Sequence, residues 1–252
     1  PDGAGQPTAL TTFEVTALDV YIDCPRRYFY EFVLGLGGRR DDAAYVQFHG
    51  CVYAVLRWLG EERSGGRIAD ETAALARLAS EWSEHGPLDH AYEAIYRHNA
   101  EAMVRRAVGG APWAGAVVER PTHEVILPHG RVRLPPDRVA PPPLGSPTPP
   151  RIQRLRTGSP SKTEDEKNIY ALYLALAEQV YPGTGATVET IYLSTDDEPH
   201  KVAPSQKVRA TRLGRYDAAI VGILAGRYPA LPDDRTCPRC PHYFICPLAE
   251  DS

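Results

Sequence analysis

The chain has 252 residues, of which 43% are hydrophobic and 24% are charged, and its formal net charge at pH 7 is −4. This composition is typical of globular proteins, and the charge excludes a protein that grips DNA through a general excess of lysine and arginine. No apolar run approaches the roughly 20 residues of a membrane span, and no secretion signal is visible. We therefore expect a cytoplasmic protein without a membrane partner.

The first half of the chain predicts helices. Residues 1–12 are polar, and "VTALDVYIDCPRRYFYEFVLGL" predicts a short helix, a break at a Cys-Pro step and a second helix. Thr16 and Asp19 resemble a capping box at the start of the first of these helices. Apolar residues at helical spacing then predict three more helices, over residues 44–60, 70–84 and 89–108.

The second half of the chain changes to an alternating pattern. The stretch "THEVILPHGRVRLPPDRVA" predicts strands with a turn at His129–Gly130. Residues 140–150 are proline-rich and predict a loop. A strand, a helix, a strand and a helix are then expected over residues 151–158, 165–183, 186–195 and 205–226. The whole chain, residues 1–252, is thus predicted to be one α/β domain without internal repeats.

Three of the five cysteines lie in "TCPRCPHYFICP" near the C-terminus, and each precedes a proline. Clustered cysteines in a chain without a secretion signal favour a metal over disulfides. Three thiolates leave one ligand position open. Cys24 also precedes a proline, whereas Cys51 lies in an apolar helical pattern and is interpreted as a core residue. The predicted ligands are Cys24, Cys237, Cys240 and Cys246.

The spacing of these cysteines leaves the metal open. Zinc sites usually take their ligands in two close pairs, whereas cluster sites tolerate unequal spacing and often contain a Cys-Pro step. The spacing therefore favours an iron–sulfur cluster, with zinc or free cysteines as alternatives. Either metal would join the two ends of the chain and would stabilise only the folded state.

Four stretches together resemble a known family: "TALDVYIDCPRRYFYEFVLGL", "PDRV", "TG…LYLALAEQVYPG" and "AAIVGILAGRYPALPDDRTCPRCPHYFICPL". They are similar to the RecB-like nuclease domain of the PD-(D/E)xK superfamily, over nearly the whole chain. The resemblance is closest to the iron–sulfur branch, found at the C-terminus of UvrD-like helicase–nucleases such as AddB and in CRISPR-adaptation nucleases.

This resemblance implies a restriction-endonuclease-like mixed central sheet flanked by helices, with an N-terminal helical insertion. It also implies a [4Fe–4S] cluster on the four cysteines, which would join the N- and C-terminal segments. The expected partners are DNA, as a single strand or a duplex end, and a helicase motor in the same chain or complex. Because the only methionine is Met103, we expect this chain to be the C-terminal part of a longer helicase–nuclease.

Nucleases of this family hold Mg²⁺ or Mn²⁺ on hard oxygen ligands and use a lysine to position or activate water. The helix histidine of their first motif is Tyr53 here, and His49 lies one helical turn earlier. A phenol is a poor Mg²⁺ ligand at neutral pH because its pKa is about 10. "PDRV" retains Asp137, either as a vestige of the metal ligand or as a turn aspartate. In the Q-x-x-x-Y motif, Tyr173 is kept and Ile169 replaces the glutamine.

The third motif departs furthest from the family. "RLRTG" places Arg154 at the carboxylate position and Arg156 at the lysine position. Arginine cannot ligate a cation, and its guanidinium stays protonated, so it cannot act as a base. We therefore predict a decayed catalytic centre without catalytic Mg²⁺. The two arginines could hold phosphate instead, or they are ordinary arginines at the end of a strand.

A second basic feature precedes the last apolar helical run. Arg209, Arg212 and Arg215 recur every three residues, so they either follow a DNA strand or belong to a solvated helix face. Three functions remain open. The first is a non-catalytic, DNA-binding domain of a helicase–nuclease that acts in DNA repair or recombination. The second is an active or weakly active metal-dependent DNA exonuclease that uses Asp137, and the third is a metal-stapled protein-interaction module.

Overall fold

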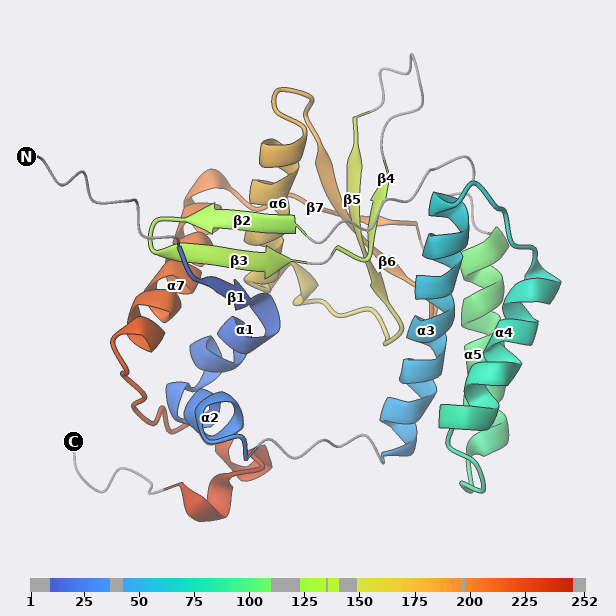
Figure 1. The fold of residues 1–252 in the computed structure, drawn as a ribbon, viewed down its shortest axis with the longest axis horizontal. Helices are drawn as coiled ribbons and strands as arrows, with labels where there is room; N and C mark the ends of the chain where they lie inside the picture. The colour runs from blue at the N-terminus through green and yellow to red at the C-terminus, as the bar shows by residue number, and fades with distance from the viewer. Residues whose placement is uncertain are drawn as a thin grey trace, which may run out of the picture. The chain divides into compact units, whose positions relative to one another are not determined.

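The computed structural model describes residues 10–36, 43–109, 123–134, 136–140, 149–195 and 198–246. The chain folds into two compact units, each assembled from segments that are separated in the sequence (Figure 1). Unit 1 comprises residues 1–38, 123–134 and 205–252, and unit 2 comprises residues 39–122 and 135–204.

Unit 1 contains a three-stranded mixed sheet in the order β1-β3-β2, with β1 parallel and β2 antiparallel to β3. Its strands are β1 (Thr12–Glu14), β2 (His123–Leu127) and β3 (Gly130–Leu134). Its helices are α1 (Val15–Asp23), α2 (Pro25–Tyr28), the π-helix η1 (Phe29–Val33), α7 (Gln206–Leu224) and the 3-10 helices η4 (Cys237–Arg239) and η5 (Tyr243–Ile245).

Helices α1 and α7 pack against each other in unit 1, and two tyrosines fix the contact. The hydroxyl of Tyr216, which is fully buried, donates a hydrogen bond to the Asp19 carboxylate at 2.6 Å. The hydroxyl of Tyr21 donates to the carbonyl of Arg227 at 2.6 Å. The ring of Tyr21 lies so close to α7 that a Cβ atom at Gly222 would be 2.1 Å from its hydroxyl oxygen. This packing therefore requires glycine at position 222.

Unit 2 contains a four-stranded mixed sheet in the order β4-β5-β6-β7. The central strands β5 and β6 are parallel, and helix α6 connects them and lies against them (Figure 1), as a parallel crossover requires. The elements of this half are β4 (Arg138–Ala140), β5 (Arg151–Arg156), the 3-10 helix η3 (Glu164–Glu166), α6 (Ile169–Val180), β6 (Thr187–Tyr192) and β7 (His200–Val202).

Three further helices of unit 2 lie side by side (Figure 1): α3 (Ala44–Ser64), α4 (Glu71–His85) and α5 (Glu93–Gly109). Their apolar faces share one core with the sheet. Its fully buried members include Val52, Val55, Leu59, Leu78, Trp82, Val104, Leu155 and Leu193. Asp70 caps α4 by accepting a hydrogen bond from the Ala73 amide at 2.8 Å.

The predicted order of helices and strands is confirmed, and three details differ. The capping box is wrong, because α1 begins at Val15 after Glu14, which makes no side-chain cap. Thr12, the last residue of the polar start, begins β1, a strand that is not among the expected elements and that pairs with β3. The described strands form two sheets and not one central sheet. Of the proline-rich stretch, Ala140 ends β4 and residues 141–148 lie outside the described residues.

The fold is a mixed α/β arrangement of helices and mixed sheets, consistent with a restriction-endonuclease-like fold. Among the helices that the structure describes, none combines the length and the apolar character needed to cross a membrane.

Candidate functional site

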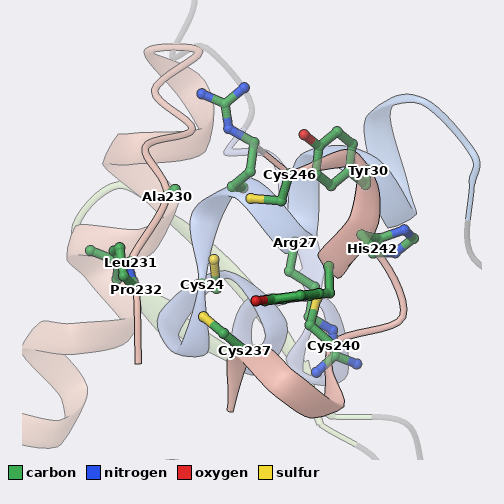
Figure 2. A pocket seen from close by; sticks show the side chains of 12 residues that line it. Cys24, Arg27, Tyr30, Ala230, Leu231, Pro232, Cys237, Cys240, His242 and Cys246 are labelled. Carbon is green, nitrogen blue, oxygen red and sulfur yellow. The ribbon is translucent and has the colours of Figure 1, made fainter. Parts of the chain in front are cut away.

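Four cysteines line one pocket of unit 1: Cys24, Cys237, Cys240 and Cys246 (Figure 2). Cys24 lies between α1 and α2, and the other three lie on or directly after η4 and η5. The backbone is extended at Cys24, Cys240 and Cys246, as expected for a residue before proline. Cys237 instead begins the η4 turn.

Hydrogen bonds between residues about two hundred positions apart form this pocket. The Tyr30 hydroxyl donates to the Ile245 carbonyl at 3.1 Å, directly before Cys246. The Arg26 amide donates to the Pro229 carbonyl at 3.1 Å. These two contacts lie next to Cys24 and Cys246 and help to bring Cys24 beside the C-terminal cysteine motif.

Charged and aromatic groups surround the four thiols. Arg27 donates to Glu31 at 2.7 Å, and Nε2 of His242 lies 3.6 Å from the same carboxylate oxygen. His242 is only 5% exposed, and its ring packs on Tyr30. Burial and the neighbouring thiols raise the pKa of Cys246. The Asp233 amide donates to the sulfur of Cys237 at 3.2 Å, the kind of contact that stabilises a thiolate.

The fifth cysteine lies in the core of unit 2, which confirms its interpretation as a core residue. Cys51 is 2% exposed, and its thiol donates to the Glu81 carbonyl at 3.6 Å. Burial raises the pKa of this thiol to about 11, so it stays protonated at neutral pH. Across the described part of the chain, no three Cys, His, Asp or Glu side chains are arranged to hold a single metal ion.

The residues at the first two family motifs converge on one peptide segment in unit 2. Asp137 precedes β4, and its carboxylate accepts a hydrogen bond from the Leu155 amide at 2.8 Å. Tyr53 on α3 donates its hydroxyl to the Leu155 carbonyl at 3.3 Å. Leu155 stands on β5 between Arg154 and Arg156. The structure therefore brings Tyr53 and Asp137 together, and both side chains form hydrogen bonds with the backbone of Leu155.

Arg154 and Arg156 surround a buried carboxylate that the sequence analysis missed. Glu164 of η3 is 2% exposed, with Arg154 Nη1 at 3.6 Å and Arg156 Nε at 4.0 Å. Lys167 pairs with the same carboxylate, and the Tyr170 hydroxyl donates to it at 2.5 Å. Only the sequence proximity of an acidic run, "EDE", could have indicated such a partner. We call Arg154, Arg156, Glu164, Lys167 and Tyr170 the Glu164 cluster.

The electrostatics of the Glu164 cluster favour its charged form. Burial by itself raises the pKa of Glu164, but hydrogen bonds from Lys167 and Tyr170 outweigh burial, and the pKa is lowered. Burial likewise opposes the charge of Arg154, while Tyr170, Tyr173 and Glu164 favour it, and its pKa is raised. Tyr173 on α6, the residue retained from the fourth motif, is itself buried.

The three arginines of the last helix lie on α7 in unit 1. Arg215 is exposed, and Arg209 and Arg212 are half-buried.

Comparison with protein-family models identifies a family: the model of the PD-(D/E)XK nuclease superfamily matches residues 12–247 of the chain. No curated protein matches the chain significantly.

Proposed function

The chain belongs to the PD-(D/E)XK nuclease superfamily, and we propose that it is a member that binds DNA without cleaving it. The family match spans segments of both units, which supports one nuclease-fold domain over residues 1–252. We further propose that it belongs to the RecB- and AddB-like iron–sulfur branch and works beside a helicase motor in the same chain or complex. The cysteine pattern supports that branch.

The Glu164 cluster is the observation that carries the proposed loss of cleavage. Mg²⁺ needs several hard oxygen ligands and releases its water reluctantly. In the cluster, the carboxylate of Glu164 is already bound by Tyr170 and by cations, and Asp137 binds the Leu155 amide. A divalent cation would have to displace these groups and would meet the charges of Arg154 and Arg156.

The same cluster supports binding of the DNA backbone. Three cations, Arg154, Arg156 and Lys167, face one carboxylate, so the cluster carries a surplus of two positive charges. The side chains of Arg156 and Lys167 are 32% and 36% exposed, whereas that of Arg154 is 18% exposed. We therefore assign phosphate binding to Arg156 and Lys167 before Arg154, whose guanidinium lies over the Tyr170 ring.

The pocket of four cysteines fits a [4Fe–4S] cluster by the chemistry of its donors. Four thiols line one pocket, and four cysteines are the donor set that a [4Fe–4S] cluster uses. Zinc sites usually take their ligands in two close pairs, whereas here one cysteine is remote and all four precede proline, so the sequence pattern supports the cluster over zinc.

The test of function combines cleavage with binding. Labelled single-stranded and duplex DNA, incubated with Mg²⁺ or Mn²⁺, should stay intact. Binding of the single strand should weaken with salt, and Arg156→Glu should reduce the slope of log K against log salt by about 0.7–0.9 for each phosphate that the variant no longer binds. Lys201→Glu, an exposed charge reversal on β7, serves as the control. Cleavage that disappears in Asp137→Ala would contradict the proposal.

Metal content tests the cluster. Protein purified without oxygen should contain about four irons per chain, as the cluster stoichiometry requires. Cys24→Ser and Cys240→Ser should lose this iron and the visible absorbance that accompanies it. Cys51→Ser is the matched control and should keep both. Stoichiometric zinc in place of iron, or loss of iron in Cys51→Ser alone, would contradict the assignment.

A further inference from the structure

A separate cavity of about 370 Å³ opens in unit 2 between the start of α3, α5 and the segment that follows β5. Its volume lies within the roughly 300–1,000 Å³ of small-ligand sites. Asp137, Tyr53 and Arg154, the residues at the family's metal positions, are not part of its lining. No member of the Glu164 cluster lines the cavity either, so the cavity and the cluster are different sites.

One wall of this cavity is aromatic. The rings of Tyr45 and Phe48 lie 4.2 and 4.3 Å from the ring of His49, measured between centroids. Phe48 is fixed from behind because it stacks on Tyr96 at 5.4 Å. Tyr45 is 57% exposed, so a flat ligand can reach it. A flat aromatic ring of a ligand can stack on such a wall.

His49 adds a neutral ring to this wall. Burial and the charge of Arg156 lower the pKa of His49, so the imidazole is neutral at pH 7. Both of its ring nitrogens are buried, so His49 contributes its ring to the wall and the wall carries no charge from it.

The opposite side of the cavity suits an anion. Arg106 of α5 lines it, and its guanidinium is oriented by a hydrogen bond to the Leu193 carbonyl at 3.0 Å. The lining also includes the hydroxyl residues Thr157, Ser159 and Ser194. The Ser194 hydroxyl donates a hydrogen bond to the Gly158 carbonyl at 2.8 Å. Among the described residues that line the cavity, none is an aspartate or a glutamate.

We propose that this cavity binds one nucleotide of a single DNA strand. The base stacks on Tyr45 beside His49, and the phosphate contacts Arg106 and the hydroxyl groups of Thr157 and Ser159. The inference rests on the proposed DNA binding and names a site for it. The aromatic wall and the guanidinium of Arg106 match the two chemical parts of a nucleotide, the base and the phosphate.

Two variants test the site by fluorescence anisotropy with a labelled oligothymidylate. Gly158→Leu fills the cavity, and nothing lies within 4 Å of a Cβ at this glycine, so the fold has room for the substitution. Tyr45→Ala removes the stacking surface, which should weaken binding about 5- to 150-fold, the range measured for stacked bases. Tyr92→Ala is the matched control, since Tyr92 is 59% exposed in the same unit but does not line the cavity.

Weaker binding in both variants with unchanged binding in Tyr92→Ala is the expected result. If wild-type protein binds the oligonucleotide and both variants bind it equally well, the cavity is not the site, while DNA binding itself stands. If wild-type protein does not bind the oligonucleotide, the proposed function and the site fail together. Should Gly158→Leu not fold, Tyr45→Ala decides alone, because its side chain is largely exposed.

Discussion

Replacement of Glu164 by glutamine tests whether this carboxylate neutralises the arginines of β5. The substitution keeps the size of the side chain and removes its charge. Glu164 is 2% exposed, and its carboxylate is bound by Tyr170, by Lys167 and by the two arginines. Loss of the charge leaves three cations without a partner in a partly buried cluster, which raises the free energy of the folded state.

The size of this effect follows from the burial of the partners. Breaking a buried ion pair by removing one partner costs about 3–5 kcal/mol, and losing a hydrogen bond to a charged group costs about 1.5–3 kcal/mol. Because the side chains of Arg154, Arg156 and Lys167 are 18%, 32% and 36% exposed, water can solvate the cations left behind. We therefore expect a loss of about 2–3 kcal/mol, or a melting temperature lower by roughly 5–10 °C.

Thermal and urea unfolding measure this loss, and Glu166→Gln is the matched control. Glu166 lies in the same 3-10 turn and is exposed, so its substitution should change stability by less than about 0.5 kcal/mol. An equal effect of the two substitutions, or none from Glu164→Gln, would refute the neutralising role of Glu164.

Acid adds an independent check on Glu164. The pKa of Glu164 is lowered in the folded protein from its ordinary value of 4.5. A carboxyl group with a lowered folded pKa contributes stability above its unfolded pKa and loses that contribution as the pH falls through the folded pKa. The difference in the free energy of unfolding between wild type and Glu164→Gln should therefore be largest at pH 7 and should decrease as the pH falls below about 4.5. A difference that stays constant as the pH falls well below that value would argue against a charge effect.

Two further predictions concern packing and motif residues. Gly222→Ala places a Cβ 2.1 Å from the Tyr21 hydroxyl, and its overpacking cost of about 1–3 kcal/mol exceeds the gain in helix propensity of up to about 1 kcal/mol. Gly214→Ala on the same helix meets nothing within 4 Å and should stabilise, so urea denaturation that ranks the two variants oppositely would contradict this packing. Tyr53→Phe loses the hydrogen bond to Leu155 and should cost about 1 kcal/mol; an unchanged urea midpoint would exclude that bond.

Helices and strands with several periodic residues could be predicted from the sequence. On α3, the apolar residues that recur at helical spacing are all buried: Phe48, Val52, Val55, Leu56 and Leu59. Strand β1 could not be predicted, because it is three residues long and its partner is β3, more than a hundred positions away. Such a strand is formed by tertiary pairing and leaves no periodicity of its own.

The cysteine pocket could be anticipated from the sequence for a local reason. Four cysteines precede proline, and Cys51 does not. The residue that follows each cysteine therefore distinguishes the predicted metal ligands from the core cysteine. The structure brings the four into one pocket and buries Cys51 in the other unit. The groups around them, such as His242 beside Tyr30, depend on contacts across the chain and could not be read from spacing.

The proposed loss of the catalytic centre shows where motif comparison stops. A motif predicts that Arg154 and Arg156 abolish metal binding, because it compares each position with the family's residue at that position. The carboxylate that makes these arginines compatible with a folded core comes from η3, outside every motif. In the sequence, Glu164 belongs to a charged run that resembles a solvated loop. In the fold it is 2% exposed and bonded to the buried Tyr170, which also bonds to Thr190.

The hydrogen bonds at Leu155 show what the residues at the first two motif positions do in this structure. In a nuclease of this family, the first and second motifs meet because both ligate a metal. Here Tyr53 and Asp137 still meet, but on the carbonyl and the amide of one residue, so both side chains now hold β5 in place. A carboxylate at position 154 alone would therefore not assemble a set of metal ligands, because Tyr53 and Asp137 are engaged in these hydrogen bonds and Glu164 in its own cluster. The proposed DNA contacts are the partly exposed cations of that cluster and the aromatic cavity in the same unit.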